Sequence, residues 1–268
     1  MKTAIPPRPK RKLGQNFLCD QNILQKIIEF IQPQSTDFIV EIGAGTGALT
    51  ALLDSRAGQV IAVELDEDLL PYLQNLSNTR VLPVDIRKVD FCTFYPEGKI
   101  RVAGNLPYYI SSSILTSLIV QRQCIQDMIL MFQEEVAQRI TAPPGDSEYG
   151  YLSVIAQYYC DIRRGFKINK NCFVPKPDIE SRILRFTFRT ETAIAFEEYA
   201  SFLERAFSQR RKKLRNNLLR TITIQPGTLD KIFTDLGLAS DVRAQNLSPA
   251  QYEQLIVATR NAQEGSTQ

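Results

Sequence analysis

Val40-Glu-Ile-Gly-Ala-Gly-Thr-Gly-Ala-Leu-Thr50 joins a predicted strand to a predicted helix through a glycine-rich turn. The strand is the apolar, β-branched run 37–42, and the helix follows the pattern of Leu49, Leu52 and Leu53. Glycines at G-x-G-x-G spacing let the backbone turn tightly and approach a ligand closely. The third glycine comes one position earlier than in a dinucleotide fingerprint, and the turn lacks the lysine of a P-loop.

Outward from this turn, predicted strands and helices alternate. The predicted strands are 37–42, 59–63, 80–84, 100–103 and 125–132. The predicted helices are 20–31, the one through Leu49, Leu52 and Leu53, 65–76 and 112–121. This alternation predicts an α/β fold, a Rossmann-like, mostly parallel sheet wrapped by helices. Runs 160–167 and 181–188 are expected to add an antiparallel edge. After residue 195 only helices are predicted, which indicates a small all-helical C-terminal domain.

We therefore expect three parts: a basic flexible arm at 1–12, a ligand-binding α/β domain at 13–189 and a helical domain at 195–262. The 268 residues contain no apolar run of the ~20 residues that span a membrane. The basic N-terminus does not resemble a secretory signal, and five scattered cysteines favour reduced thiols in the cytoplasm. There is no histidine, which excludes Ser-His, Cys-His and His-zinc mechanisms, and no metal site is predicted.

Positive charge is concentrated in two places, although the net charge is only +3. One is the arm at 1–12, and the other is the segment 205–220, which holds seven basic residues and no acid. Such clusters are typical of contacts with a phosphate backbone, although a solvated helix face is the plainer explanation. The predicted nucleic-acid contacts are Arg210, Arg211, Lys212, Lys213 and Arg215.

Two acids follow predicted strands, at the sheet edge where ligands bind in such folds. Glu64 lies 21 residues after Gly43 and can accept hydrogen bonds from both ribose hydroxyls. Asp85 can accept from the exocyclic amine of an adenine. A ribose site and an adenine site without a diphosphate cradle favour S-adenosylmethionine over a nicotinamide dinucleotide. The alternative is that both acids are helix N-caps or surface residues.

Asn105-Leu-Pro-Tyr108 ends another predicted strand, and we expect Gly104 to let the backbone turn just before it. The side-chain oxygen of Asn105 and the carbonyl of Leu106 are acceptors for an adenine amine. Pro107 holds Leu106 extended, and the ring of Tyr108 offers a stacking face. The alternative is a strand end, a proline turn and a tyrosine in the core. Near the N-terminus, Phe17 and Leu18 can cover the pocket while Asn16 reaches the methionine end of the cofactor.

These motifs together resemble one family, the bacterial small-subunit ribosomal RNA adenine dimethyltransferases. The resemblance covers nearly the whole chain. The matching segments are Gly14-Gln-Asn-Phe-Leu18, Glu41-Ile-Gly-Ala-Gly-Thr-Gly47, Glu64-Leu-Asp66, Asp85, Asn105-Leu-Pro-Tyr108, Phe173-Val-Pro-Lys-Pro-Asp-Ile-Glu-Ser181 and Arg210-Arg-Lys-Lys-Leu-Arg-Asn-Asn217.

The resemblance implies an enzyme that uses S-adenosyl-L-methionine to dimethylate N6 of two adjacent adenosines in the 3′-terminal hairpin loop of 16S rRNA, with a role in small-subunit biogenesis. The implied partner is 16S rRNA within the 30S subunit or its precursor, and we expect a monomer. The expected cofactor contacts are Asn16, Leu18, Gly43, Gly45, Glu64, Leu65, Asp85, Ile86 and Asn105. The expected catalytic residues are Asn105, Leu106, Pro107, Tyr108 and Phe173, with Phe173 stacking on the base opposite Tyr108.

Three other functions fit parts of the pattern. The sister enzymes that dimethylate one adenosine of 23S rRNA share the pocket, and only the segments 173–181 and 210–217 argue against them. A DNA adenine methyltransferase commonly carries an acid where Asn105 stands. A mainly non-catalytic ribosome assembly factor would keep the fold without needing the complete pocket.

Overall fold

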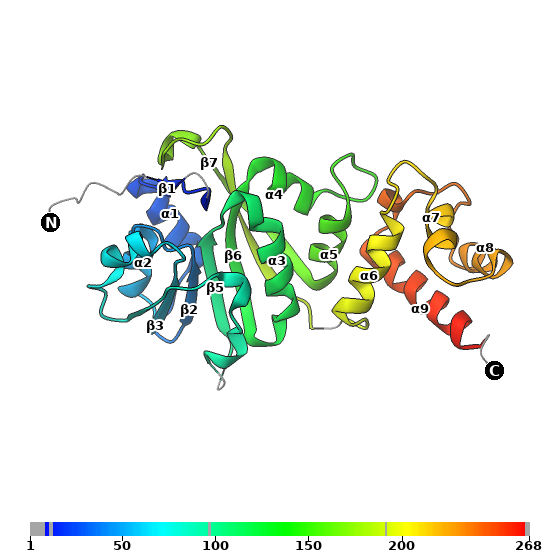
Figure 1. Cartoon of the computed structure of the whole chain (residues 1–268), viewed down its shortest axis with the longest axis horizontal. Helices are drawn as coiled ribbons and strands as arrows, with labels where there is room; N and C mark the ends of the chain where they lie inside the picture. Colours follow the sequence, from blue (N-terminus) through cyan, green and yellow to red (C-terminus); the bar gives the residue numbers. More distant parts are fainter. Residues whose placement is uncertain (1–8, 11–12, 96–97, 191, 266–268) are drawn as a thin grey trace. The chain divides into compact units, whose positions relative to one another are not determined.

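The computed structural model describes residues 9–10, 13–95, 98–190 and 192–265. It divides into two compact units, Met1–Ala137 with Asp161–Phe188 and Gln138–Cys160 with Arg189–Gln268 (Figure 1). We expected all of 138–160 to belong to the first domain, and the structure groups this segment with the C-terminal helices instead. The reason is aromatic packing, because Tyr158 and Tyr159 contact the ring of Tyr199.

The first unit is built on a seven-stranded sheet with the strand order β4-β3-β2-β5-β6-β9-β7. Strands β2 to β6 pair in parallel, and β9 runs antiparallel to β6. The strands are β2 (Phe38–Ile42), β3 (Gln59–Val63), β4 (Thr79–Leu82), β5 (Ile100–Asn105), β6 (Ile125–Gln133), β7 (Cys160–Ile168) and β9 (Ser181–Phe188). The prediction of a mostly parallel sheet with an antiparallel edge is confirmed.

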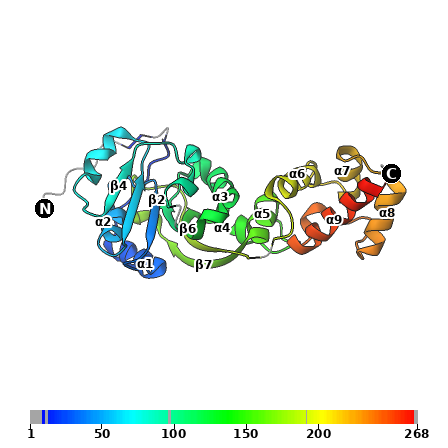
Figure 2. The ribbon, with the colours of Figure 1, turned by 90° about the horizontal axis from the view of Figure 1, so that it is seen from below.

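Helices cover both faces of this sheet. Figure 2 shows α1 (Gln21–Ile31) and α2 (Ala48–Asp54) on one side of the strands and α3 (Ser111–Val120) on the other. Leu24 and Ile27 of α1 pack against Ile39, Ala103 and Ile129 of the sheet, and all five are buried. Asp20 caps α1 as expected, since its Oδ1 accepts from the N–H of Asn22 at 2.9 Å and of Ile23 at 3.0 Å.

The segment predicted as a helix at 65–76 is a 3₁₀ helix, η2 (Glu67–Leu73). Pro71 lies inside it and has no N–H to donate, which disfavours a regular α-helix at this point. The other short elements of this unit are 3₁₀ helices η3 (Ile86–Lys88), η4 (Phe91–Thr93), η5 (Tyr108–Ile110), η6 (Arg122–Cys124) and η7 (Lys170–Cys172), and the strands β1 (Phe17–Leu18) and β8 (Phe173–Val174), which pair antiparallel.

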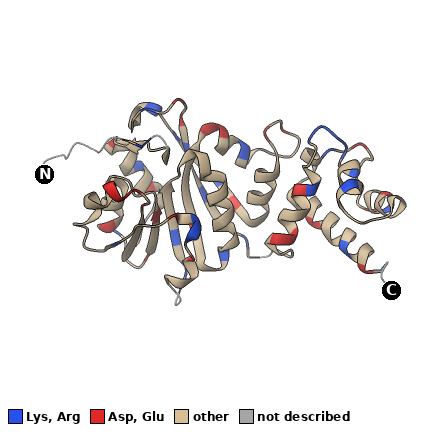
Figure 3. Ribbon diagram, in the orientation of Figure 1, with Lys and Arg blue, Asp and Glu red and all other residues tan. Residues whose placement is uncertain are grey.

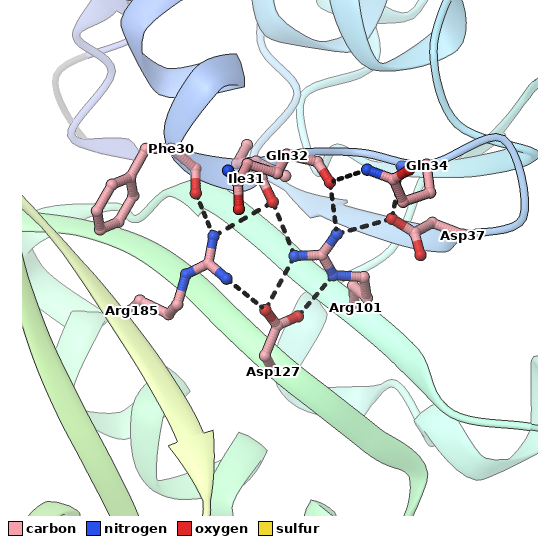
Figure 4. Close-up of polar contacts among 8 residues, drawn as sticks. All are labelled: Phe30, Ile31, Gln32, Gln34, Asp37, Arg101, Asp127 and Arg185. Carbon is pink, nitrogen blue, oxygen red and sulfur yellow. Dashed lines mark hydrogen bonds and ion pairs between the residues drawn. The ribbon is translucent and has the colours of Figure 1, made fainter.

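A buried ionic network anchors the end of α1 at the amino-terminal side of the parallel strands (Figure 4). Arg101 donates to Asp127 at 2.8 and 2.9 Å, to Asp37 at 2.7 Å and to the carbonyl of Ile31 at 2.8 Å. Arg185 donates to the carbonyl of Phe30 and to Asp127. The last carbonyls of a helix have no partners within the helix, so the two guanidinium groups satisfy them and fix α1 against the sheet.

The second unit is built mainly from helices and the segments that connect them. Its helices are α5 (Tyr151–Tyr159), α6 (Phe196–Ala206), α7 (Leu214–Thr221), α8 (Pro226–Asp235) and α9 (Pro249–Gly265), with η8 (Ala244–Asn246); α4 (Glu134–Thr141) crosses from the first unit. Its core is rich in tyrosine. The hydroxyls of Tyr149, Tyr199 and Tyr252 donate to backbone carbonyls at 2.8, 3.0 and 2.6 Å, so each polar tip is satisfied where it is buried.

Two expectations concerned the compartment. We expected reduced cysteines, but Cys92 and Cys124 form a disulfide, with Cα atoms 5.1 Å apart on η4 and η6. Their separation of 32 residues concealed this proximity. Cys19 and Cys172 are free thiols. Among the described residues, no helix combines the length and the apolar character that a membrane crossing needs.

Candidate cofactor and base site

The strand order reverses between β2 and β5, and the carboxyl ends of these two strands form the site. The turn after β2 carries Gly43, Gly45 and Gly47 with φ of 70°, 58° and 79°, a conformation that favours glycine. A Cβ at Gly43 would lie 3.3 Å from the carbonyl oxygen of Asn105. The glycines therefore bring the turn close to the end of β5.

Glu64 follows β3 and is almost fully buried. Its Oε2 accepts from the N–H of Gly45 and its Oε1 from the N–H of Asp66, both at 2.8 Å. Burial raises the pKa of Glu64, and these two hydrogen bonds act in the opposite direction. The carboxylate is thus held in one orientation beside the glycine turn, as a ribose acceptor requires.

Asp85 lies at the N-cap of η3 and is already engaged. Its carboxylate accepts from Nε of Arg87 at 3.0 Å and from Nη2 at 2.6 Å. These hydrogen bonds lower the pKa of Asp85, so it stays ionised. A carboxylate oxygen has two lone pairs, so an adenine amine can still be accepted beside Arg87.

Asn105 is the last residue of β5, and in its side-chain amide only the nitrogen has a hydrogen-bond partner among the described residues. Its Nδ2 donates to the carbonyl of Asn16 at 3.1 Å. Its Oδ1 is buried, and no described residue donates to it. An unsatisfied buried acceptor is costly, and at an enzyme site it indicates a ligand that supplies the missing donor.

Gly104 does not turn the chain, contrary to our expectation. It lies inside β5, and a Cβ there would be 2.5 Å from the carbonyl oxygen of Ile42. The residue is glycine because two strands approach closely. Tyr108 is half-buried just beyond, and its hydroxyl hydrogen-bonds with that of Ser181 at 3.0 Å.

One pocket brings together most of the predicted site. Of the predicted residues it is lined by Asn16, Gly43, Gly45, Glu64, Leu65, Asp85, Ile86, Asn105, Leu106, Pro107 and Tyr108. Sequence reasoning missed the contributions of Leu13, Gly14, Gln15 and Tyr109 to this pocket. The motif around Asn16 was the available signal, because a segment that brings one side chain to a pocket also brings its neighbours.

Leu18 and Phe173 are not part of this lining. They face each other as partners in the β1–β8 pair, and both pack in the core with α1. The ring of Phe173 is 1% exposed, so the structure offers no free face for stacking on a base. This differs from our expectation, because a Phe before two prolines here packs inward. Leu18 instead lines a neighbouring cavity beneath the glycine turn.

Glu41 lines that second cavity and is a functional group that the sequence did not single out. It is 3% exposed, and no described residue donates to its Oε2. Burial raises the pKa of Glu41 to about 8, with a smaller contribution from the charge of Glu64, while Thr50 partly offsets the shift. A buried carboxyl of this kind is protonated at neutral pH.

The five predicted RNA contacts lie in the second unit, and Figure 3 shows the positive charge on the loop before α7. Arg211, Lys212 and Lys213 are exposed and line a groove with Arg243. Arg210 instead donates to the carbonyls of Ser147 and Tyr149. Arg215 pairs with Asp230 of α8, an acid outside the basic segment.

The expected basic arm is only partly described, since residues 1–8 and 11–12 lie outside the described residues. Within it, Lys10 does not extend freely. Its ammonium contacts the carboxylates of Asp66 and Asp68.

Three observations fit the pocket to S-adenosylmethionine and to a second ligand that carries an amine. The glycine turn has the left-handed φ angles that favour glycine, and it brings Gly43 and Gly45 to the lining of the pocket. Glu64 presents a fixed carboxylate at the end of β3, the usual position of a ribose acceptor. Asn105 keeps an unpaired acceptor for a second, amine-bearing ligand.

Comparison with known proteins agrees with this site. A family model described as ribosomal RNA adenine dimethylase matches residues 8–260. "Ribosomal RNA small subunit methyltransferase A" of Hahella chejuensis is 42% identical over 228 residues, which is 82% of this chain and 84% of that protein. The protein of the same name from Legionella pneumophila (strain Corby) is 39% identical over 254 residues, covering 92% and 96%.

Two solved structures share the fold across both units. A dimethyladenosine transferase from Plasmodium falciparum has a TM-score of 0.80 at 25% identity, covering 92% of this chain and 98% of that one. The 23S rRNA methyltransferase ErmE has a TM-score of 0.69 at 24% identity, covering 91% and 99%. The second likeness concerns the fold alone. Because the family model spans nearly the whole chain and the pocket holds the groups that methyl transfer needs, the chain belongs to the ribosomal RNA adenine dimethylase family, whose methyl donor is S-adenosylmethionine.

Proposed function

We propose that this enzyme dimethylates N6 of two adjacent adenosines in the 3′-terminal hairpin loop of 16S rRNA and so takes part in small-subunit biogenesis. The observation that carries the proposal is the unpaired Oδ1 of Asn105, held in the pocket because its Nδ2 is bonded to Asn16. An adenine amine supplies the donor that this oxygen lacks. The relatives named as small-subunit methyltransferases support the choice of RNA.

The residues would divide the work between two ligands. Asn16, Gly43, Gly45, Glu64, Leu65, Asp85 and Ile86 would hold S-adenosylmethionine, which supplies the methyl group from its sulfonium and departs as the neutral thioether S-adenosylhomocysteine. Asn105 Oδ1 and the carbonyl of Leu106 would accept from the N6 amine. These contacts favour a pyramidal nitrogen and release its lone pair for in-line attack. Positioning then supplies much of the catalysis.

No strong base is needed before attack in this mechanism. The nitrogen becomes cationic as it is methylated, and water can take its proton afterwards. This agrees with a chain that contains no histidine. Tyr108 would support the flipped-out base by stacking, worth ~1–3 kcal/mol per base.

The second unit would bind the RNA. We infer that the first unit carries methyl transfer and that 195–262 contacts phosphates, chiefly through Arg211, Lys212 and Lys213 of the exposed loop. On this proposal the substrate is 16S rRNA within the 30S subunit or its precursor, and the enzyme acts as a cytoplasmic monomer.

Incubation with methyl-labelled cofactor and unmodified small subunits tests the proposal directly. Mapping the labelled nucleotides should give two adjacent dimethylated adenosines in the 3′-terminal loop of 16S rRNA. Unmodified large subunits, incubated in parallel, should take up no label. Label in 23S rRNA instead would assign the chain to the sister activity and overturn the proposal.

A further inference from the structure

The segment Leu13 to Phe17 forms one wall of the pocket, although it comes from outside the sheet. It ends in β1, and its described contacts attach it to both halves of the site. One attachment involves the loop that follows Glu64, and the other involves Asn105 itself. These two attachments suggest that the segment couples the cofactor half to the base half.

The first attachment is to Asp66, which is 4% exposed. Gln15 Nε2 donates to Asp66 Oδ2 at 2.6 Å, and Lys10 donates to Oδ1. The N–H of Asp66 in turn donates to Glu64 Oε1. Asp66 is therefore two positions after Glu64, and it is hydrogen-bonded directly to the Glu64 carboxylate that is placed for the cofactor ribose.

The second attachment sets the orientation of Asn105. A side-chain amide has a donor end and an acceptor end, and a rotation of half a turn exchanges them. The carbonyl of Asn16 accepts from Nδ2 at 3.1 Å, which selects the orientation that leaves Oδ1 toward the pocket. If Asn16 moved away, nothing described would prevent the amide from presenting its donor end to the base.

A third contact limits how the segment can move. Gly14 has φ of 62°, and a Cβ there would lie 3.3 Å from the ring of Tyr109. The segment is thus packed against the residue that follows the base motif. The packing at Gly14 and the hydrogen bonds of Gln15 and Asn16 therefore hold three consecutive residues of the segment.

We propose that Asp66 is a positioning residue for the base site. It anchors Gln15, Gln15 places Asn16, and the carbonyl of Asn16 holds Asn105 as an acceptor for N6. Asp66 touches neither the base nor the reacting atoms in this scheme. The inference rests on the proposed function, because it assigns the orientation of Asn105 a role in methyl transfer.

Gln15 carries the main part of this link. Lys10 is 45% exposed, and ion pairs at that exposure contribute little in salt. Asp66 also caps η2, since its Oδ1 accepts from the backbone N–H of Asp68 at 3.1 Å. The side chain of Asp68 contacts Lys10 and is 66% exposed. Asp68→Asn therefore serves as a matched control that removes a neighbouring acid without touching Gln15 or Asn16.

The test compares Gln15→Ala, Asp66→Ala and Asp68→Asn with the wild type. With saturating cofactor and unmodified small subunits, Gln15→Ala and Asp66→Ala should lower kcat about tenfold, the size expected for one lost orienting hydrogen bond. Asp68→Asn should change kcat less than twofold. Gln15→Ala keeps the test valid if Asp66→Ala folds poorly, because Gln15 caps no helix.

A readout without catalysis separates this inference from the proposed function. The side-chain ¹⁵N amide resonance of Asn105 should shift in Gln15→Ala and stay in place in Asp68→Asn. If the resonance does not shift, or if the kcat of Gln15→Ala at saturating cofactor equals that of the wild type, Asp66 supports only the cofactor half of the site. A wild type that methylates no small subunits would overturn the proposed function, while the resonance would still test the link.

Discussion

The pocket of the first unit and the basic groove of the second differ in how their side chains are held. Glu64 and Asn105 are mostly covered, and hydrogen bonds set their orientation. Arg211, Lys212 and Lys213 are exposed. A buried, oriented group acts through its geometry and its missing partner, whereas an exposed cation acts through its charge and is screened by salt. Single substitutions should therefore affect the two regions in different ways.

Asn105→Ala should give the largest effect, lowering kcat roughly 10²–10³-fold, because one preorganised group at the reacting centre is lost. Asn216→Ala, in the basic groove, is the matched control and should change kcat little. Steady-state methylation of small subunits measures both. Equal losses in the two variants would remove the distinction between the regions.

Glu64→Gln should weaken cofactor binding about 10–100-fold, since hydrogen bonds to a charged group are worth ~1.5–3 kcal/mol. Equilibrium dialysis with labelled cofactor gives the Kd directly. Glu67→Gln is the control, because Glu67 is a nearby exposed acid. An unchanged Kd in Glu64→Gln would show that Glu64 holds only the backbone of the pocket.

Tyr108→Leu and Phe173→Leu should separate the two predicted stacking residues. Loss of stacking at Tyr108 should lower kcat/KM about tenfold or more for RNA. Phe173→Leu should lower the free energy of unfolding by ~1–2 kcal/mol and leave kcat/KM close to that of the wild type, because its ring is in the core. A matching loss of kcat/KM in Phe173→Leu would restore its predicted role beside the base.

Glu41→Gln should change how stability depends on pH. The pKa of Glu41 is raised to about 8 in the folded chain, from 4.5. Its contribution to stability is therefore complete below about pH 4.5 and is lost as pH rises toward 8. Because the chain has no histidine, few other groups titrate in that window.

Thermal unfolding at pH 5 and pH 8 measures this effect. The wild type should lose stability between the two values, and Glu41→Gln should lose less. At pH 8 the variant should melt above the wild type. Parallel pH profiles for the two proteins would contradict the assignment of a protonated Glu41.

Arg211→Ala and Arg215→Ala should give the smallest and most salt-dependent effects. Each free cation that contacts a phosphate contributes ~0.7–0.9 to the slope of log Kd against log salt. Arg211→Ala should reduce the slope by about this amount, and Arg215→Ala by less, because Asp230 already pairs with Arg215. Equal reductions would mean that RNA displaces Asp230.

The sheet and most of the pocket were predictable from sequence because their signals are local. Strand periodicity located β2, β3 and β5, and the residue that ends a parallel strand necessarily lies at the ligand-binding edge. This reasoning was enough to predict that Glu64 and Asn105 lie at the ligand-binding edge. Asn16 ends no predicted strand, and it was assigned to the pocket by the segment before the first helix and by the family resemblance, which did not single out Gly14 or Gln15 beside it.

The remaining features depend on contacts between distant segments. Phe173 is buried because β8 pairs with β1, and Arg215 is neutralised by α8; neither follows from the neighbouring sequence. Gly104 is needed for a close approach of two strands rather than for a turn. The Cys92–Cys124 bond and the grouping of α5 with the C-terminal helices likewise depend on tertiary packing.

The central claim is that Asn105 accepts a hydrogen bond from the N6 amine of the target adenine. The most direct measurement is a crystal structure of the enzyme with S-adenosylhomocysteine and adenosine. The account predicts N6 at about 2.7–3.2 Å from Asn105 Oδ1, with Nδ2 still bonded to the carbonyl of Asn16 and the adenine ring against Tyr108. An adenine bound with N6 beyond the reach of Oδ1, or an inverted amide, would contradict it.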